Sequence, residues 1–291
     1  MIGTMNTYGE EIKKHIDEAD AVIVGIGSEF AADVDKIAAE NEMYLFFKSC
    51  IIEYNNISVD DIEQYVKYSV YYNELSKGQN KAINKYIVSY KKIHTLLENK
   101  RYFVLTTNTD DIIYKGGFDE NNIAAPCGSI LRFQAGCDCD GYCQSAKPVL
   151  EEIYKALCEL KNTKENLTQD IVSGYVEAIK SIIPKCESCH TLRKFSVHSE
   201  KGYDESGYLQ QWEKYTRWLQ LTLNKKLTLL ELGVGFDTPT VIRWPFEKIA
   251  MLNYKAWLYR INRKVPQLPL EIKDKGTSIN ENSFEFINSN L

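Results

Sequence analysis

The sequence of 291 residues lacks any apolar run long enough to cross a membrane. Its first residues, MIGTMNTYGEE, have no basic start, apolar middle or small-residue cleavage site, so they do not resemble a secretory signal. Positive charge is not in excess either, since the formal net charge is -5. We therefore expect a cytoplasmic protein with no membrane or general nucleic-acid partner. Its length allows one large core, or one core plus a small inserted module.

The first glycine-rich turn lacks part of the dinucleotide-binding pattern. Residues 21–24 (AVIV) predict a short strand, GIGS follows at 25–28, and residues 29–39 are expected to form a helix. A strand, a glycine turn and a helix start bring backbone N–H groups and a helix dipole towards a pyrophosphate. The third glycine of GxGxxG is absent, and Glu29 puts a negative charge near the phosphate position. This segment alone is thus also compatible with a turn that binds no nucleotide.

A second strand pattern ends abruptly in polar residues. The apolar residues 103–105 (FVL) predict a buried strand, and TTNTD at 106–110 breaks it. In an open α/β sheet, ligands bind beyond the carboxyl ends of the strands. There, four side chains would offer the donors and acceptors that suit a ribose: Thr106, Thr107, Asn108 and Asp110. The alternative is a strand followed by an Asx-turn.

Two later strand patterns end in the same way. Residues 227–232 (LTLLEL) predict a strand that leads into a second glycine turn, GVGFDTP at 233–239, in which Pro239 suits the first turn of a helix. Residues 256–261 predict a further strand, and Asn262 and Arg263 follow it. Four strand ends thus carry Gly, Asn, Thr or Asp, which favours a dinucleotide crevice more strongly than any one of them does.

Five of the eight cysteines fall into two clusters, CDCDGYC at 137–143 and CESC at 186–189. The first lies in a turn-rich stretch, 132–143, that is not expected to form a core element. Zn²⁺ prefers four soft ligands and stabilises modules too small for a core. The expected ligands are Cys139, Cys143, Cys186 and Cys189, with Cys137 as a substitute in the first pair and His190 as a replacement for one cysteine. Free cysteines and a redox CxxC are the alternatives, although no thioredoxin-like pattern flanks residues 186–189.

The remaining segments predict helices, over residues 8–20, 150–160, 167–182, 209–223 and 284–287 and several within 37–97. Six tyrosines of the last region are expected to pack between helices with a wet hydroxyl instead of forming a substrate cage: Tyr65, Tyr68, Tyr71, Tyr72, Tyr86 and Tyr90. The expected domains are residues 1–126 with 196–291, which carry the sheet, and residues 127–195, which form the inserted module with its helices.

In this order the motifs resemble those of the sirtuin (silent information regulator) family. The resemblance rests on GIGS at 25–28, TTNTD at 106–110, the two cysteine clusters, LGVGFDTP at 232–239 and IN at 261–262. Among sirtuins, the runs FVLTTNTD, GFD, FQ and ELGVGFDTPTVIRWPF are most similar to the macrodomain-linked, microbial class M sirtuins. Residues 31–100 have no counterpart in these motifs.

The resemblance implies a Rossmann-like α/β fold, with a parallel sheet, helices on both faces and a small inserted zinc-binding module. It also implies an enzyme that cleaves the nicotinamide–ribose bond of NAD and then transfers ADP-ribose to a protein acceptor, or deacylates a lysine. By resemblance, Asn108 would hold the nicotinamide ribose and position the attacking group, and Asp110 would shape the same pocket. The implied NAD-binding residues are Gly25, Gly27 and Ser28 at the pyrophosphate, Thr107 and Asn108 at the ribose, Gly233, Gly235 and Thr238 at the phosphates and ribose, and Asn262 at the adenosine ribose.

One step departs from the family pattern. Sirtuins have a His-Gly step, or Gln-Gly in class M, where this chain has Cys127-Gly128. Cys127 is therefore a third candidate catalytic residue, acting as a nucleophile or weak base if its pKa is lowered, or else a buried and inert thiol. Plain hydrolysis of NAD and a non-catalytic module that binds NAD or ADP-ribose are the alternative functions.

Overall fold

The computed structural model describes residues 5–54, 57–135, 143–200 and 202–291. The chain divides into two compact units, each of which is described by itself. The first comprises Met1–Ala31, Lys85–Gly128 and Tyr208–Leu291, and the second comprises Ala32–Asn84 and Ser129–Gly207. This division differs from the expected one chiefly in residues 32–84, which group with the inserted module and not with the large sheet.

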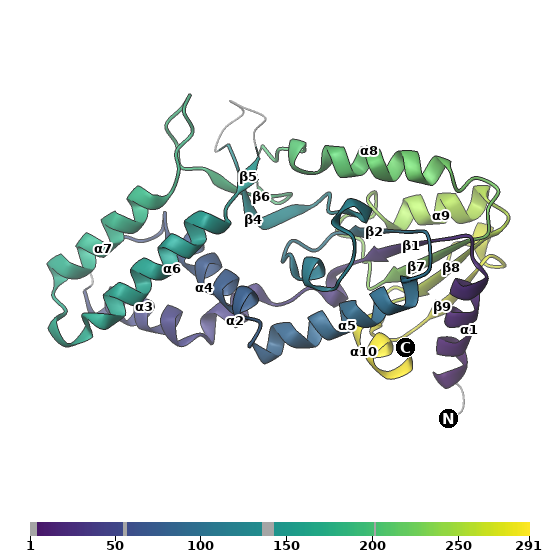
Figure 1. Ribbon diagram of the computed structural model, residues 1–291, viewed down its shortest axis with the longest axis horizontal. Helices are drawn as coiled ribbons and strands as arrows, with labels where there is room; N and C mark the ends of the chain where they lie inside the picture. The colour runs from purple at the N-terminus through teal and green to yellow at the C-terminus, as the bar shows by residue number, and fades with distance from the viewer. Residues whose placement is uncertain (1–4, 55–56, 136–142, 201) are drawn as a thin grey trace. The chain divides into compact units, whose positions relative to one another are not determined.

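A six-stranded sheet, parallel throughout, forms the centre of the first unit (Figure 1). In spatial order its strands are β3 (Ile123–Ala124), β2 (Tyr102–Thr106), β1 (Ala21–Ile26), β7 (Leu227–Leu232), β8 (Ala256–Ile261) and β9 (Gly276–Ile279). Counted along the chain within this sheet, the order is 3-2-1-4-5-6, which is that of the doubly wound dinucleotide-binding sheet. The predicted Rossmann-like α/β fold is confirmed, and its topological switch point lies between β1 and β7.

Burial on both faces explains the apolar runs of the central strands. Every residue of β1, β2 and β7 is buried, as expected of parallel strands that helices cover on both sides. On one face, Phe103 and Leu229 pack in a core with residues of α8 (Ser206–Gln220) and α9 (Arg243–Leu252). On the other side of the sheet lie α1 (Met5–Glu18), α5 (Lys81–Leu97) and α10 (Ser283–Asn290) (Figure 1).

The second unit contains a group of helices and a small sheet. The helices are α2 (Val34–Ala39), α3 (Glu42–Glu53), α4 (Glu63–Lys77), α6 (Lys147–Asn162) and α7 (Gln169–Ile182). The sheet has the order β5 (Gln144–Ser145), β4 (Gly128–Gln134) and β6 (Lys194–Val197). The expectation that the stretch from Arg132 cannot enter a core is wrong for residues 132–134. They belong to β4, where Phe133 is fully buried and packs against Tyr65 and Phe195 with ring centroids 6.0 and 5.0 Å apart.

The helix expected over residues 29–39 forms only over its second half, Val34–Ala39. A short 3-10 turn, η1 (Ser28–Phe30), follows β1, and α2 begins only at Val34 with Asp33 as its N-cap. Phe30, the last residue of this turn, is fully buried and packs against Tyr90 and Phe284. We attribute the end of the turn to this packing, which holds the Phe30 backbone at the core. A pyrophosphate at Gly27 would therefore meet backbone N–H groups of this turn, and not the start of a long helix.

Further 3-10 turns are η2 (Ile112–Lys115), η3 (Glu120–Asn122), η4 (Lys164–Asn166) and η5 (Leu270–Ile272). Within the described residues, no helix has the length and apolar character needed to cross a membrane.

Candidate functional site

The two glycine turns lie in backbone contact at the carboxyl ends of β1 and β7. The Gly27 N–H donates to the Leu232 carbonyl at 2.8 Å. A Cβ on Gly27 would lie 2.5 Å from the Gly233 oxygen and 2.6 Å from Val234 Cα, which leaves no room for a side chain. Gly233 adopts a φ of +63°, a conformation that favours glycine. The two predicted turns thus form one glycine-lined cradle at the switch point of the sheet.

Other predicted residues of these turns have different surroundings. Gly25 is the fifth residue of β1, and a Cβ there would lie 2.4 Å from Ile242 Cγ2, so packing of the α9 region explains this glycine. Ser28 is exposed beyond the strand end. Gly235 is open, because the nearest atom to an added Cβ is Asp237 Oδ2 at 3.7 Å.

The polar end of β2 lies beside this cradle, since the Thr107 N–H donates to the Ile26 carbonyl at 3.0 Å. The turn alternative is correct for two side chains of this segment. Thr106 Oγ1 accepts from the Asn108 N–H, and Asp110 Oδ1 accepts from the Ile112 N–H, both at 3.0 Å. Asn108 is different, because its buried side-chain nitrogen has no hydrogen-bond partner among the described residues. That amide is therefore a donor available to a ligand.

Cys127, the residue before β4, contacts the part of segment 233–239 that follows its glycines. Its buried thiol donates to Thr238 Oγ1 at 3.8 Å, so the structure brings a predicted catalytic residue to a predicted NAD-binding residue. Burial raises the pKa of Cys127, and the hydrogen bond with Thr238 only partly opposes this rise. The thiol therefore stays protonated at neutral pH, and a protonated thiol is a weak nucleophile.

Asn262 and Glu29 join the turns of the site to one another. The Asn262 amide donates to the Val234 carbonyl at 3.0 Å, and its oxygen accepts from the N–H groups of Lys264 and Val265 at 2.8 Å. The Glu29 carboxylate accepts from Arg263 N at 2.9 Å and from Ser283 N, in the first turn of α10, at 2.6 Å. These two backbone N–H groups, one of them at the N-terminus of α10, therefore bind the charge of Glu29. Asn262, whose amide is used within the protein in this way, is only 3% exposed.

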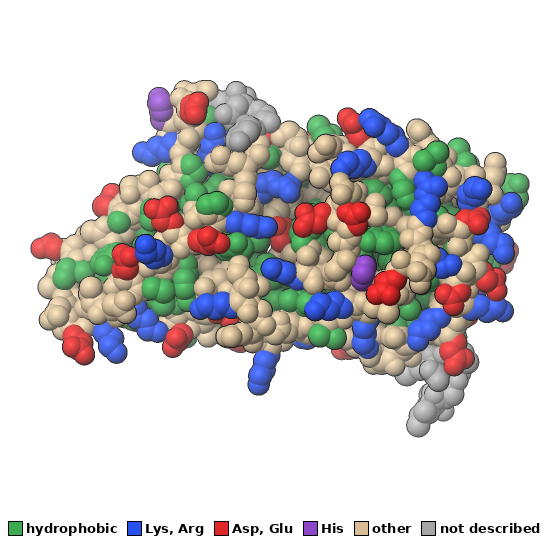
Figure 2. Space-filling view, in the orientation of Figure 1, with side chains coloured by type: hydrophobic (Ala, Val, Ile, Leu, Met, Phe, Trp, Pro, Cys, Tyr) green, Lys and Arg blue, Asp and Glu red, His purple; other side chains and the backbone are tan. Residues whose placement is uncertain are grey.

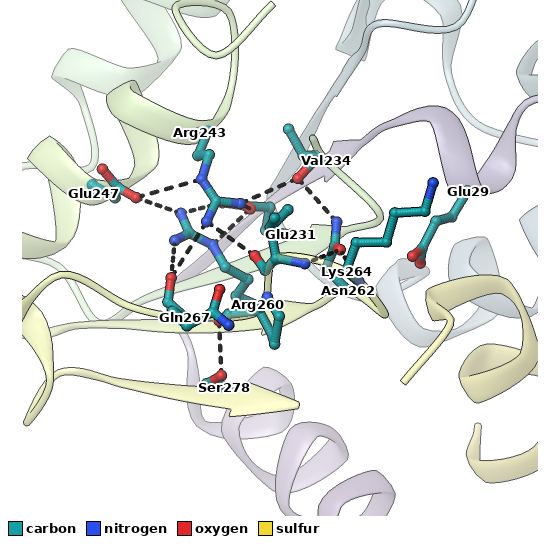
Figure 3. Close-up of polar contacts among 12 residues, drawn as sticks. Glu29, Glu231, Val234, Arg243, Glu247, Arg260, Asn262, Lys264, Gln267 and Ser278 are labelled. Carbon is teal, nitrogen blue, oxygen red and sulfur yellow. Dashed lines mark hydrogen bonds and ion pairs between the residues drawn. The ribbon is translucent and has the colours of Figure 1, made fainter. Parts of the chain in front are cut away.

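A buried ion cluster lies directly behind the second glycine turn (Figure 3). Glu231 of β7 forms a bidentate pair with Arg260, its register partner on β8, at 2.7 and 2.9 Å. Arg260 also contacts Glu247 at 2.8 Å, and Arg243 lies 3.5 Å from Glu231. Both carboxylates are therefore paired, as a buried charge requires.

The same arginines also bind the backbone of the turn after β7 and of the loop after β8. Arg243 donates to the carbonyls of Val234 at 3.2 Å and Val265 at 3.0 Å, and Arg260 donates to Gln267 at 2.8 Å. The cluster thus fixes the turn after β7 and the loop after β8. Sequence reasoning misses it, although a signal exists: Glu231 and Arg260 each stand one position before the end of an apolar strand.

Three of the four expected zinc ligands, Cys143, Cys186 and Cys189, are described by the structure and belong to the second unit. Cys143 Sγ lies 3.7 Å from Ser196 Oγ, and Cys189 Sγ lies 3.0 Å from Thr191 Oγ1. Cys186 is buried, and its N–H donates to the Thr191 carbonyl in the turn that carries both cysteines. Cys139 and Cys137 lie outside the described residues. Within the described part of the chain, no group of three or more His, Cys, Asp or Glu side chains could hold a metal, so the zinc site stays a prediction.

NAD fits the donors that the first unit presents. The absence of side chains at Gly27 and Gly233 lets the two turns pack together. The unpartnered Asn108 amide belongs to the end of β2, which the hydrogen bond from Thr107 to Ile26 holds beside the first turn. Hydroxyl and amide groups around a glycine cradle are the chemistry that a dinucleotide requires.

Comparison with known proteins gives two relatives and a fold. No protein-family model matches the chain. A curated relative from Staphylococcus aureus, "Protein ADP-ribosyltransferase", is 22% identical over 299 residues and covers 97% of this chain and 86% of that protein. A second, from Fusarium oxysporum f. sp. cubense, is a "Probable bifunctional ADP-ribose hydrolase/ADP-ribosyltransferase"; it is 27% identical over 182 residues, 60% of this chain and 28% of that protein.

Among solved structures, "Sir2-p53 peptide-NAD+" superposes with a TM-score of 0.50 at 12% identity, covering 96% of this chain and 95% of that chain. At this identity the similarity establishes the fold and not the activity.

Proposed function

We propose that this chain, which has the fold of the sirtuins, is an NAD-dependent transferase that releases nicotinamide and transfers ADP-ribose to a protein side chain. The observation that carries the proposal is the unpartnered Asn108 amide beside a glycine cradle at the switch point of the sheet. The printed activities of the two relatives support the same reaction class.

In the proposed reaction, the nicotinamide–ribose C–N bond breaks and nicotinamide leaves with the electron pair. A nucleophilic side chain of the acceptor protein then bonds to the ribose carbon and loses its proton. Asn108 would hold the ribose hydroxyls through its free amide donor. Because β2 and the two turns fix its neighbours, Asn108 would contribute chiefly by positioning the ribose for attack.

Cys127 would act in this reaction as a neutral neighbour of Thr238 and not as a nucleophile, because burial raises its pKa. Histidine-dependent deacylation has no counterpart here, since a thiol stands at that step. We therefore place protein ADP-ribosylation before lysine deacylation.

A transfer assay tests the acceptor. Purified protein would be incubated with NAD labelled on its adenine and a pool of proteins, and label bound to protein would be measured after denaturation. We expect bound label from wild type and not from Asn108→Ala. Release of nicotinamide without bound label would instead support hydrolysis of NAD. Loss of an acetyl group from an acetylated peptide would support deacylation.

The raised pKa of Cys127 also favours a second candidate, a module that binds NAD or ADP-ribose without catalysis. Titration of NAD by calorimetry distinguishes the two. A binding module would bind NAD and leave it intact over the time of the assay.

We also propose that Cys139, Cys143, Cys186 and Cys189 hold a structural Zn²⁺ in the second unit. The spacing CxxC at 186–189 supports this proposal. His190, directly after the second cysteine of that pair, has a left-handed backbone conformation with a φ of +58°. A cytoplasmic location with no nucleic-acid or membrane partner is proposed from the net charge of -5. On the face that Figure 2 shows, acidic and basic side chains are interspersed, which supports only the part of this proposal that concerns nucleic acid.

A further inference from the structure

Glu29 connects three segments at the carboxyl end of the large sheet. It stands two residues after Gly27, and its side chain packs on the second glycine turn, where a Cβ added to Gly233 would lie 2.9 Å from Glu29 Cγ. Its carboxylate accepts from the N–H groups of Arg263, in the loop after β8, at 2.9 Å and of Ser283, at the start of α10, at 2.6 Å. Figure 3 shows Glu29 beside that loop. A side chain from the end of β1 thus places its charge at the end of β8.

The strand order determines which part of NAD would approach this charge. Across the sheet the order is β2, β1, β7 and β8. Asn108 follows β2, the two glycine turns follow β1 and β7, and Arg263 follows β8. With the nicotinamide ribose at Asn108 and the pyrophosphate at the turns, the other ribose extends in the same direction and comes to the end of β8. This assignment rests on the proposed function, and it makes Glu29 a neighbour of the adenosine ribose.

The Glu29 carboxylate has acceptor capacity left for a ribose hydroxyl. A carboxylate offers about four lone-pair positions. The two backbone N–H groups use two of them, and Glu29 is only partly buried, so a ligand can approach the others. The guanidinium of the adjoining loop is engaged elsewhere, because Arg263 pairs with Glu285 at 2.8 Å. The carboxylate is therefore a negatively charged acceptor at the end of β8.

We propose that Glu29 determines the choice of NAD over NADP. A 2′-hydroxyl of the adenosine ribose can donate a hydrogen bond to the carboxylate, whereas a 2′-phosphate brings further negative charge to it and is repelled. In other dinucleotide sites an acidic residue binds the adenosine ribose of NAD, and an arginine accommodates the phosphate of NADP. The negative charge that departs from the phosphate-binding pattern after Gly27 thus serves to recognise the ribose.

Glu29→Gln tests the proposal, because it removes the charge and keeps the length of the side chain and one acceptor oxygen. NAD and NADP would each be titrated into the full chain by calorimetry. We expect wild type to bind NAD at least about thirtyfold more tightly than NADP, and Glu29→Gln to lower this ratio about tenfold, chiefly through tighter binding of NADP. If Glu29 only joined the three segments, the variant would weaken both nucleotides alike, and an unchanged ratio would overturn the proposal.

Asp20→Asn is the matched control. Asp20 also joins two connections of the sheet through a backbone N–H, that of Lys226 at 2.9 Å, but it does so at the amino end of β1 and β7. We expect Asp20→Asn to leave the ratio of the two affinities unchanged.

A second measurement uses wild type alone and so does not depend on the folding of a variant. The preference for NAD is expected to fall as sodium chloride is raised from about 0.05 to about 0.5 M, because salt screens the repulsion between the carboxylate and the 2′-phosphate. A preference that is independent of salt would overturn the proposal, as would equal affinities. Tighter binding of NADP would also overturn it and would point to Lys264, an exposed cation of the same loop, as the partner of the phosphate.

Binding and catalysis separate this proposal from the proposed function. Wild type that binds NAD but releases no nicotinamide would contradict the proposed function alone, because the ratio of affinities still decides the role of Glu29. Release of nicotinamide from NAD and NADP with equal kcat/KM would contradict the role of Glu29 alone. Binding of neither nucleotide would overturn both.

Discussion

Within the segment TTNTD at 106–110, some side chains form the turn and one, Asn108, has an unpartnered donor. Thr106 and Asp110 bind backbone N–H groups and so build the turn, as Asx- and Ser/Thr-turns do in many loops. Asn108 between them keeps a free donor. The sequence predicts that this segment ends a buried strand in polar groups. It does not separate turn formers from ligand contacts, because both use the same side-chain chemistry.

At the residue scale, the first prediction concerns Cys127. Because burial raises the pKa of its thiol, we expect Cys127→Ser to keep nicotinamide release within about threefold of wild type. Alkylation of Cys127 by iodoacetamide, followed by mass spectrometry of the peptide, is expected to be slow at pH 7 and to rise only above the usual thiol range. Rapid alkylation at pH 7 together with an inactive serine variant would show instead that Cys127 is the nucleophile.

The second prediction compares two glycines. Gly27→Ala would place a Cβ 2.5 Å from the Gly233 carbonyl oxygen, which is backbone and cannot move aside freely. We expect Gly27→Ala to separate the two turns, to cost about 1–3 kcal/mol of stability and to weaken NAD binding at least tenfold. Gly235→Ala meets no atom closer than 3.7 Å and is the control, expected to fold and unfold like wild type. Calorimetric titration with NAD and denaturant unfolding measure both, and equal affinities would contradict the cradle.

At the scale of elements, the sequence predicts the central strands well. Strands β1, β2, β7 and β8 were expected because burial on both faces requires uninterrupted apolar runs. Strand β9, the sequence GTSI, is not predicted, because it is an edge strand that is half exposed and carries only one fully buried apolar residue, Ile279. The 3-10 turn after Gly27 is missed for another reason: it depends on the burial of Phe30 against residues more than 50 positions away.

The third prediction tests the ion cluster that joins β7, β8 and α9. Glu231→Ala leaves Arg260 and Arg243 buried with less negative charge beside them. We expect a loss of about 3–5 kcal/mol in the free energy of unfolding, measured with urea. The pair Arg217–Glu213 is the control, since both side chains are largely exposed, and Arg217→Ala is expected to cost less than about 1 kcal/mol. A small loss for Glu231→Ala would mean that the cluster does not hold the two loops.

At the scale of the whole molecule, the sequence predicts an inserted module but not its full extent. Residues 32–84 show helical periodicity, and periodicity alone does not tell which core a helix joins. Tyr65 illustrates the point, because it packs on Phe195 and donates to the Arg193 carbonyl at 2.5 Å, a partner 128 positions away. The Cys127-Gly128 step lies at the boundary between the two units and belongs to the first.

The fourth prediction concerns zinc in the second unit. Because structural zinc binding is coupled to folding, Cys186→Ser is expected to lose the metal and to lower the Tm, whereas Cys50→Ser, a buried cysteine outside both clusters, is expected to keep the metal. Metal content is measured by atomic emission on protein purified without added zinc. One zinc per chain in Cys186→Ser would contradict the proposed ligand set.

Release of free nicotinamide from NAD tests the central claim most directly. Wild type, Asn108→Ala and a control at an exposed asparagine of the same unit, Asn121→Ala, would be incubated with NAD while nicotinamide is followed by chromatography. We predict release by wild type and by Asn121→Ala, and a loss of at least a hundredfold, about 2.7 kcal/mol of transition-state stabilisation, in Asn108→Ala. Equal release by Asn108→Ala, or no release by wild type with acceptor proteins present, would contradict the account.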